Sequence, residues 1–183
     1  MSIEALRAML PAYARDIAAN LAVLAEETVL SDQAKWGCFV ACAHAVGEPS
    51  SSRAIEAAAK AAGLSPEAFD GAKTASAIMA MNNVYFRALH LMAAPEYRDL
   101  PSRLRMNRLS RPSVSAVDYE LWCLAVSAIN GCGACLDSHE AELRERGVST
   151  LEIQTSLRIA AVVNAVGRVL AAEFSANPQK WGV

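Results

Sequence analysis

The sequence predicts an all-α protein, a compact helical bundle with one core. Apolar residues recur at the three- and four-residue spacing of amphipathic helices, and no segment alternates polar and apolar residues as a strand does. Capping residues, glycines and prolines divide the chain into segments of helical length. A chain of 183 residues hides roughly 70% of its surface on folding. One domain of this size therefore needs no disulfide or structural metal for its stability.

The first half is expected to hold five helices. Capping residues set three of the starts, at Ser31, at the serines 50–52 and at Ser65, while Pro11 suits the first turn of the second helix. The expected ranges are 3–9, about 11–24, 31–46, 50–62 and 65–92. In the second helix, one face carries Tyr13, Ile17, Leu21 and Leu24.

Three further helices are expected after an extended connection framed by Pro95, Pro101 and Pro112. The first runs from Val117 to about Ile129, is capped by Ser113 or Ser115, and ends at Asn130-Gly131. The next starts at the cysteine pair and ends at Gly147. Ser149-Thr-Leu-Glu152 is a capping box for the last, which reaches Phe174. Pro178 and the terminal Trp-Gly-Val are expected to form a loosely held tail.

A faint internal repeat relates the two halves, about 1–95 and 112–183. The segment from Trp36 resembles the one from Trp122, and Ala77 to Asn83 resembles Arg158 to Asn164. The halves can be interpreted as a duplicated helical unit of which only the second kept a close cysteine pair. Chance similarity between alanine-rich helices is the alternative.

Composition narrows the class of protein. Hydrophobic residues make up 54%, many of them alanine, and a helical protein with this surplus often buries part of it between subunits, so we expect an obligate oligomer. The net charge of −2 and the absence of a basic stripe argue against nucleic-acid binding. The N-terminus lacks the features of a signal peptide, and the apolar stretches are broken well short of the ~20 residues of a membrane span. We therefore expect a cytoplasmic protein.

Two cysteines carry the strongest chemical signal. In Asn130-Gly-Cys-Gly-Ala-Cys135, Gly131 stops one helix and the next begins at once, so Cys132 lies at a helix N-terminus and Cys135 in its first turn. The unpaired N–H groups and the dipole of that end favour thiolate over thiol. An odd total of five cysteines in a reducing compartment favours redox use of a close pair over a disulfide framework. The pair predicts a redox-active dithiol.

His139 lies in phase with the pair. At ~100° per residue, Cys132, Cys135 and His139 fall within about 60° of one helix face. That face also carries Leu136 and Leu143, so we expect the two sulfurs to be half-buried beneath the helix. The other side is polar, with Asp137, Glu140, Arg144 and Glu145. An imidazole one turn away can take or return a proton.

Alternatives remain for the site residues. The pair can instead be half of a zinc site, although four ligands are needed and only three are local. His139 can be a core histidine. Glu120 can be an exposed first-turn carboxylate that favours the helix dipole, or, if buried, a general base for a thiol.

The remaining candidates are interpreted as structural. Cys38 and Cys42, at i and i+4, suit a disulfide poorly, and we assign them and Cys123 to the core. His44 and His90 have no evident partner. The methionines and asparagines of one long helix are interpreted as packing and helix-contact residues; they are Met79, Met81, Asn82, Asn83 and Met92.

Together these residues resemble a known family. Glu120-Leu-Trp-Cys-Leu-Ala-Val-Ser-Ala-Ile-Asn-Gly-Cys-x-x-Cys135, followed by His139, is similar to the active-site region of the AhpD family of alkyl hydroperoxide reductases, within the carboxymuconolactone-decarboxylase-like superfamily. The likeness extends over nearly the whole chain. It includes the opening Met-Ser-Ile-Glu, Trp36-Gly37, Ala77-Ile-Met-Ala-Met-Asn-Asn-Val84 and Leu104-Arg-Met-Asn107.

The resemblance implies a fold, an assembly and an activity. The fold would be a single AhpD-like domain over residues 1–183 with a duplicated helical core, assembled as a homotrimer. The activity would be that of an antioxidant thiol peroxidase that also reduces the peroxiredoxin AhpC. No cofactor would be bound. Electrons would come from NADH through dihydrolipoamide dehydrogenase and the lipoyl domain of a 2-oxoacid dehydrogenase acyltransferase.

The resemblance also implies residue roles. Cys135 would be the attacking thiolate, Cys132 would resolve it by forming a Cys132–Cys135 disulfide, and Glu120 and His139 would serve the proton relay. One position departs from the pattern: the family usually has histidine immediately before the second cysteine, where this chain has Ala134. We therefore expect direct peroxide reduction to be weaker than dithiol–disulfide exchange.

Two other functions stay open. One is an electron-transfer adaptor that passes electrons to a peroxiredoxin without reducing peroxide itself. The other is a carboxymuconolactone-decarboxylase-like protein whose cysteine pair is structural or binds a metal.

Overall fold

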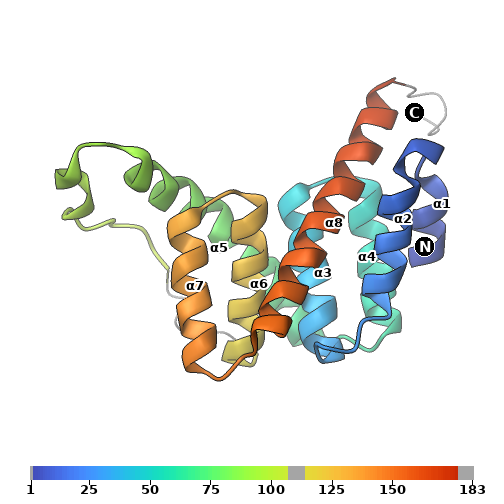
Figure 1. The fold of residues 1–183 in the computed structure, drawn as a ribbon, viewed down its shortest axis with the longest axis horizontal. Coiled ribbons are helices and arrows are strands. Elements are labelled where there is room, and N and C mark those ends of the chain that lie inside the picture. Colours follow the sequence, from blue (N-terminus) through green and yellow to red (C-terminus); the bar gives the residue numbers. More distant parts are fainter. Residues whose placement is uncertain (1, 107–113, 177–183) are drawn as a thin grey trace.

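The protein is all-α, as the sequence predicts. The computed structural model describes residues 2–106 and 114–176, and within them the chain forms eight α-helices, two short 3-10 turns and no strand (Figure 1). The helices are α1 Ile3–Met9, α2 Arg15–Ala25, α3 Asp32–Val46, α4 Pro49–Ala61, α5 Pro66–Leu91, α6 Ala116–Ile129, α7 Gly133–Glu145 and α8 Thr150–Ala176. The 3-10 turns are η1 Ala12–Ala14 and η2 Pro95–Arg98.

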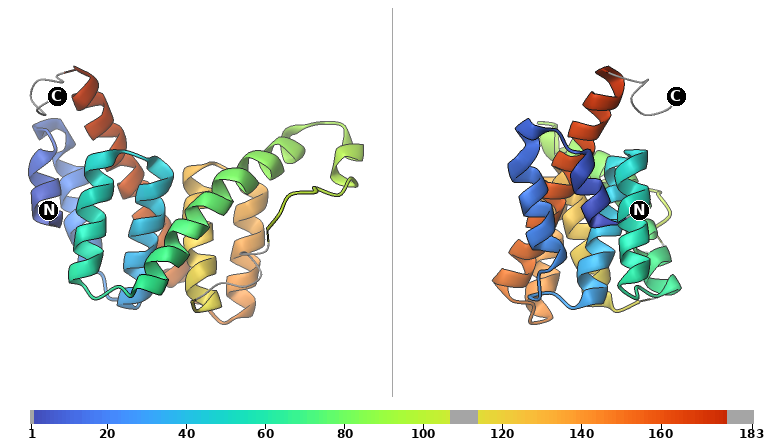
Figure 2. Two further views of the ribbon diagram at one scale, coloured as in Figure 1. Left: turned by 180° about the vertical axis from the view of Figure 1, so that it is seen from behind. Right: turned by 90° about the vertical axis from the view of Figure 1, so that its right-hand side faces the viewer.

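Helices α3 and α6 form the centre of the fold. They pack against each other, and α5 crosses one face of the pair while α8 crosses the other (Figure 1 and Figure 2). Helices α1, α2 and α4 gather on the α3 side, and α7 packs on the α6 side. This arrangement explains why α3 and α6 are apolar around much of their circumference: each is covered from several directions.

A tryptophan and a glycine set the approach of α3 to α6. Trp122 of α6 is fully buried, and its indole Nε1 donates a hydrogen bond to the Ala34 carbonyl at 3.0 Å. A Cβ atom on Gly37 would lie 2.2 Å from the Trp122 ring. Only a glycine therefore allows the indole to lie against the backbone of α3.

Capping residues begin the helices largely as expected. The hydroxyls of Ser31, Ser65 and Ser115 each accept a backbone N–H of the first turn. The Ser149–Glu152 capping box is confirmed, with Ser149 N to Glu152 Oε2 at 2.8 Å and Glu152 N to Ser149 Oγ at 3.2 Å. The expected alternative cap Ser113 lies outside the described residues, as do Pro112 and Asn107.

Two expected helix starts are corrected. Glu48, not the serine cluster, caps α4, because its carboxylate reaches forward to the backbone N–H groups of Ser50 and Ser51. The second helix starts at Arg15, after η1. Tyr13 therefore leaves the apolar face: its side chain is exposed and its hydroxyl donates to Glu173 at 2.8 Å.

The connection between the halves forms an arm. Helix α5 extends beyond the body of the bundle, and residues 92–106 continue from its end through η2 (Figure 1). Large apolar side chains are exposed along this arm, namely Leu91, Met92, Tyr97, Leu100 and Leu104. The expected C-terminal tail, including Pro178, lies outside the described residues.

The two halves have similar helix patterns. Helices α3, α4 and α5 contain 15, 13 and 26 residues, and α6, α7 and α8 contain 14, 13 and 27. Such a correspondence is what a duplicated unit would produce.

One helix has the length and composition of a membrane span even though polar residues interrupt its apolar stretches. Among the described residues, α8 is long and apolar enough to cross a membrane by length and composition. A count of unbroken apolar runs overlooks it, because isolated polar residues interrupt a helix of high mean hydropathy. In the fold, α8 packs against α2, α3 and α6, and the side chains on that face are buried.

Candidate active site

The dithiol lies at the junction of α6 and α7. Gly131, with a positive φ of 66°, ends α6 in the left-handed region that favours glycine. Cys132 is the N-cap residue of α7, and its N–H donates to the Ser127 carbonyl at 3.1 Å. A disulfide joins Cys132 to Cys135, whose Cα atoms are 5.3 Å apart. The pair is therefore held at a helix N-terminus, where unpaired N–H groups favour a thiolate.

The two sulfurs are more buried than we expected. Cys132 has no exposed surface and Cys135 only 7%, whereas the helix face alone predicted half-buried side chains. The difference arises because α5 and α6 both cover that face of α7. Leu143 is buried with the cysteines, while the charged residues of the opposite face are in solvent, as expected.

Glu120 and His139 form a pair between two helices. Glu120 Oε2 of α6 and His139 Nδ1 of α7 lie 2.6 Å apart, with side chains 16% and 10% exposed. Glu120 is therefore a largely covered partner of the imidazole and not an exposed first-turn carboxylate. Because a carboxylate only accepts, Nδ1 donates in this pair.

The other nitrogen of His139 contacts a methionine. Nε2 lies 3.3 Å from Met79 Sδ of α5. Both ring nitrogens thus lie beside atoms that can accept a hydrogen bond. The spacing within α5 predicts a packing role for Met79, and its contact with His139 of another helix is one that helix spacing cannot predict.

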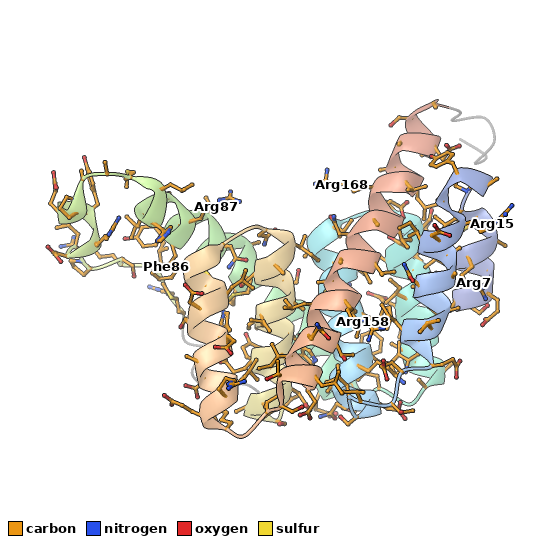
Figure 3. The ribbon with its side chains drawn as sticks, in the orientation of Figure 1. Arg7, Arg15, Phe86, Arg87, Arg158 and Arg168 are labelled. Atoms are coloured by element: carbon orange, nitrogen blue, oxygen red, sulfur yellow. A yellow bond between two sulfur atoms is a disulfide. The ribbon has the colours of Figure 1, made fainter. Side chains whose placement is uncertain are left out.

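A buried polar network supports the turn before Cys132. Asn83 of α5 donates to Ser127 Oγ at 2.9 Å, and Asn130 donates to Asn83 Oδ1 at 3.0 Å. Arg87, also on α5, donates to the carbonyl of Asn130. Figure 3 shows Arg87 beside the end of α6. The sequence signal for this network was an adjacent asparagine pair inside an otherwise apolar helix.

A pocket of about 500 Å³ opens beside Cys135. Helices α5 and α7 form its walls, and Phe86 lies on the α5 side next to α7 (Figure 3). Its lining is mostly apolar and comprises Met79, Asn82, Phe86, Leu89, His90, Arg98, Met106, Ala134, Cys135, Ser138 and His139. Cys132 is not part of this lining, so of the two sulfurs only that of Cys135 borders the pocket.

Ala134 lies on the pocket wall. The position that departs from the family pattern therefore faces the same space as Cys135 and His139. His90 of α5 also lines this pocket, although its sequence context indicates no partner for it.

The other three cysteines belong to the core, as predicted. Cys38, Cys42 and Cys123 are free and buried. Burial in apolar surroundings raises the pKa of each of these thiols well above its ordinary value. These three thiols therefore stay protonated and unreactive in the folded protein.

His44 does have a partner, contrary to our expectation. Its Nε2 lies 2.7 Å from Glu56 Oε1 of α4, and Lys73 Nζ of α5 lies 3.1 Å from the same oxygen. This cluster joins α3, α4 and α5. Within residues 2–106 and 114–176, no three His, Cys, Asp or Glu side chains gather as a group that could hold a metal ion.

Comparison with known proteins gives the family. A model of the carboxymuconolactone decarboxylase family matches residues 95–176. The chain is 62% identical over 179 residues to "Alkyl hydroperoxide reductase AhpD" of Caulobacter vibrioides (strain NA1000 / CB15N), covering 98% of each chain. The chain belongs to the AhpD family of alkyl hydroperoxide reductases.

Further AhpD relatives support this. The protein of the same name from Hyphomonas neptunium is 60% identical over 173 residues, with 94% of this chain and 96% of the relative covered. That from Streptomyces avermitilis is 51% identical over 173 residues, covering 94% and 97%. In this AhpD-family protein the likeness spans both halves, and the dithiol, Glu120 and His139 all lie within it.

Proposed function

We propose that the protein reduces alkyl hydroperoxides with the Cys132–Cys135 dithiol. The observation that carries this is the position of the disulfide: it lies beside the Glu120–His139 pair, at the wall of an apolar pocket. A nucleophile, a proton donor and a substrate space are thus brought together by three helices.

Cys135 is the attacking residue in this proposal, because it borders the pocket and Cys132 does not. In the reduced protein its thiolate attacks the terminal oxygen of the hydroperoxide. The O–O bond breaks, Cys135 becomes a sulfenic acid, and the alkoxide takes a proton from the His139 imidazolium to leave as the alcohol. Glu120 holds His139 in place through Nδ1.

Cys132 completes the oxidation. Its thiol gives a proton to His139, and the resulting thiolate attacks the Cys135 sulfenic sulfur. Hydroxide leaves and takes the proton from His139 to become water, while the disulfide forms. Over the cycle two thiol groups are oxidised, and one hydroperoxide becomes one alcohol and one water.

A lipoyl dithiol re-reduces the disulfide in our proposal. Dihydrolipoamide attached to the lipoyl domain of a 2-oxoacid dehydrogenase acyltransferase would exchange with Cys132–Cys135, and dihydrolipoamide dehydrogenase would restore it with NADH. The aliphatic lipoyl chain suits the apolar pocket walls. The reduced dithiol would then also reduce an AhpC-type peroxiredoxin by the same exchange chemistry.

We also propose a cytoplasmic homotrimer. The exposed apolar side chains of the arm, including Leu91, Tyr97 and Leu100, support burial of this segment against another subunit. A free dithiol that cycles with lipoyl groups suits a reducing compartment.

The test is peroxide turnover with dihydrolipoamide as the only reductant. We expect cumene hydroperoxide reduction by the natural protein, its loss in Cys135→Ser and Cys132→Ser, and its retention in the core control Cys123→Ala. Turnover that appears only when a peroxiredoxin is added would instead assign the adaptor function. A dithiol that peroxide leaves unoxidised, or stoichiometric zinc, would favour a structural or metal-binding pair.

A further inference from the structure

Asn82 is a buried polar residue at the pocket. The residue lies on α5 and is 3% exposed. Among the described residues, its Oδ1 atom accepts no hydrogen bond. Asn82 also lines the pocket that contains Cys135 and His139. A buried amide without a partner costs free energy, and such a group at an active site calls for an explanation.

The neighbouring asparagine shows what a structural role looks like. Asn83 donates to Ser127 and accepts from Asn130, so both ends of its amide are used to support the turn before Cys132. Asn82 takes no part in that network. Asn82 directly precedes Asn83 on the helix, and the side chain of Asn82 lies at the pocket instead.

The position of Asn82 on α5 places it next to the reacting groups. Met79, Asn82 and Phe86 are spaced at i, i+3 and i+7 and line the same pocket, so they follow one another along one helix face. Met79 contacts His139 Nε2, and Phe86 provides the apolar wall (Figure 3). On this helix face Asn82 therefore lies between the residue that contacts His139 and the residue that forms the apolar wall.

We infer that Asn82 binds the hydroperoxide by accepting a hydrogen bond from its O–H group. This inference rests on the proposed function. The proton of a hydroperoxide sits on the terminal oxygen, which is the atom that Cys135 attacks. A hydrogen bond to Asn82 Oδ1 thus orients that oxygen towards the sulfur and the alkoxide towards His139.

The same hydrogen bond persists through the step. When the S–O bond forms and the O–O bond breaks, the hydroxyl stays on Cys135 as the sulfenic acid and can still donate to Asn82. The lipoyl dithiol offers S–H groups, which are weak donors. Asn82 therefore distinguishes the two half-reactions: it serves oxidation by peroxide and not reduction by dihydrolipoamide.

The experiment measures both half-reactions in single turnovers. In Asn82→Leu, a change of similar size that removes the acceptor, we expect the second-order rate constant for oxidation by cumene hydroperoxide to fall about 10- to 100-fold. The rate of disulfide reduction by dihydrolipoamide should be unchanged. The melting temperature should be unchanged or higher, because no hydrogen bond is lost. Asn82→Gln, which keeps the acceptor, should recover part of the rate. Asn20→Leu, at an exposed position of α2, is the matched control.

The possible failures are distinct. If the natural protein is not oxidised by peroxide, the proposed function fails and the inference with it. If the natural protein is oxidised and Asn82→Leu is oxidised equally fast, only the inference is overturned. It is also overturned if Asn82→Leu slows both half-reactions alike or lowers the melting temperature, since Asn82 would then be a structural residue.

Discussion

Glu120 and His139 belong to different helices, yet Glu120 Oε2 lies 2.6 Å from His139 Nδ1. The pair links α6 to α7 across the turn that carries Cys132. Because Nε2 of the same ring reaches Met79 of α5, one imidazole connects all three helices of the site. Its orientation is thus set by groups on either side of it, and not by its own helix alone.

Removing the charge of this pair should slow peroxide reduction. In Glu120→Gln the side chain keeps its size and can still accept from His139, but it no longer stabilises an imidazolium. We expect kcat/KM for cumene hydroperoxide to fall about 10- to 100-fold, with an unchanged circular dichroism spectrum. Glu140→Gln, at an exposed position of α7, should retain full activity. Equal rates for the two variants would show that Glu120 has no part in proton transfer.

Only two of the five cysteines should respond to peroxide. Burial raises the pKa of the Cys38, Cys42 and Cys123 thiols, so they stay protonated near neutral pH. Alkylation of the reduced, native protein should label Cys132 and Cys135 alone. After peroxide treatment, mass spectrometry should find the loss of two hydrogens confined to the peptide that holds both. Oxidation of Cys38 or Cys42 in the folded protein would contradict the site assignment.

Restoring a histidine at position 134 should raise peroxide turnover. Ala134 lines the pocket beside Cys135, so an imidazole there would add a group able to exchange protons with the reacting atoms. In Ala134→His we expect faster oxidation by cumene hydroperoxide and an unchanged rate of disulfide exchange with dihydrolipoamide. Ala134→Asn, polar without a titratable ring, is the control. No gain in the histidine variant would refute the idea that Ala134 limits the peroxidase step.

A single methyl group between α3 and α6 should destabilise the fold. In Gly37→Ala the new Cβ would lie 2.2 Å from the Trp122 ring, so the indole or the helix must shift. We expect the free energy of unfolding to fall by about 1–3 kcal/mol, measured by urea denaturation. The same change at Gly133, where a Cβ would meet nothing within 4 Å, should cost little. Equal effects would mean that the contact with Trp122 does not restrict this position.

The His44–Glu56 cluster should make stability depend on pH. Partial burial raises the pKa of Glu56, but hydrogen bonds from His44 and Lys73 outweigh it and hold the pKa below its usual 4.5. A carboxylate with a lowered folded-state pKa stabilises the protein above pH 4.5, and that contribution is lost as the pH falls through the lowered pKa. Glu56→Gln should therefore cost up to about 1 kcal/mol at pH 7, since the group is partly exposed.

The measurement compares urea midpoints of Glu56→Gln and the natural protein at pH 7 and near pH 3. The difference should be present at pH 7 and shrink at the lower pH. A difference that stays constant over this range would mean that the charge of Glu56 does not contribute. Glu67→Gln, an exposed first-turn residue of α5, is the matched control.

Much of the site could be predicted from local sequence. The end of α6 at Gly131, the start of α7 at the cysteine pair and the phase of Cys132, Cys135 and His139 follow from glycine conformation, capping and the 3.6-residue period. These features depend on residues a few positions apart in one chain segment. The core assignment of Cys38, Cys42 and Cys123 follows from the apolar helices that carry them.

Other parts of the site depend on which helices meet. Met79 and Asn82 precede the cysteine pair by about fifty residues, and both were interpreted as packing residues because nothing in their own helix points to a partner. The depth of the sulfurs was underestimated for the same reason: α5 and α6 add cover that α7 alone does not reveal. The partner of His44 was missed because Glu56 and Lys73 come from two other helices.

By itself, then, the sequence determined an all-α chain and a dithiol at a helix N-terminus with His139 on the same face, since capping and helical periodicity act over a few residues. The tertiary structure decided that Glu120 meets His139 and that Cys135 and not Cys132 borders the pocket. It also decided that the buried Asn82 Oδ1 atom has no hydrogen-bond partner among the described residues. The physical reason is the packing of α5 and α6 against α7, which depends on the fit of whole helix faces and on no local pattern.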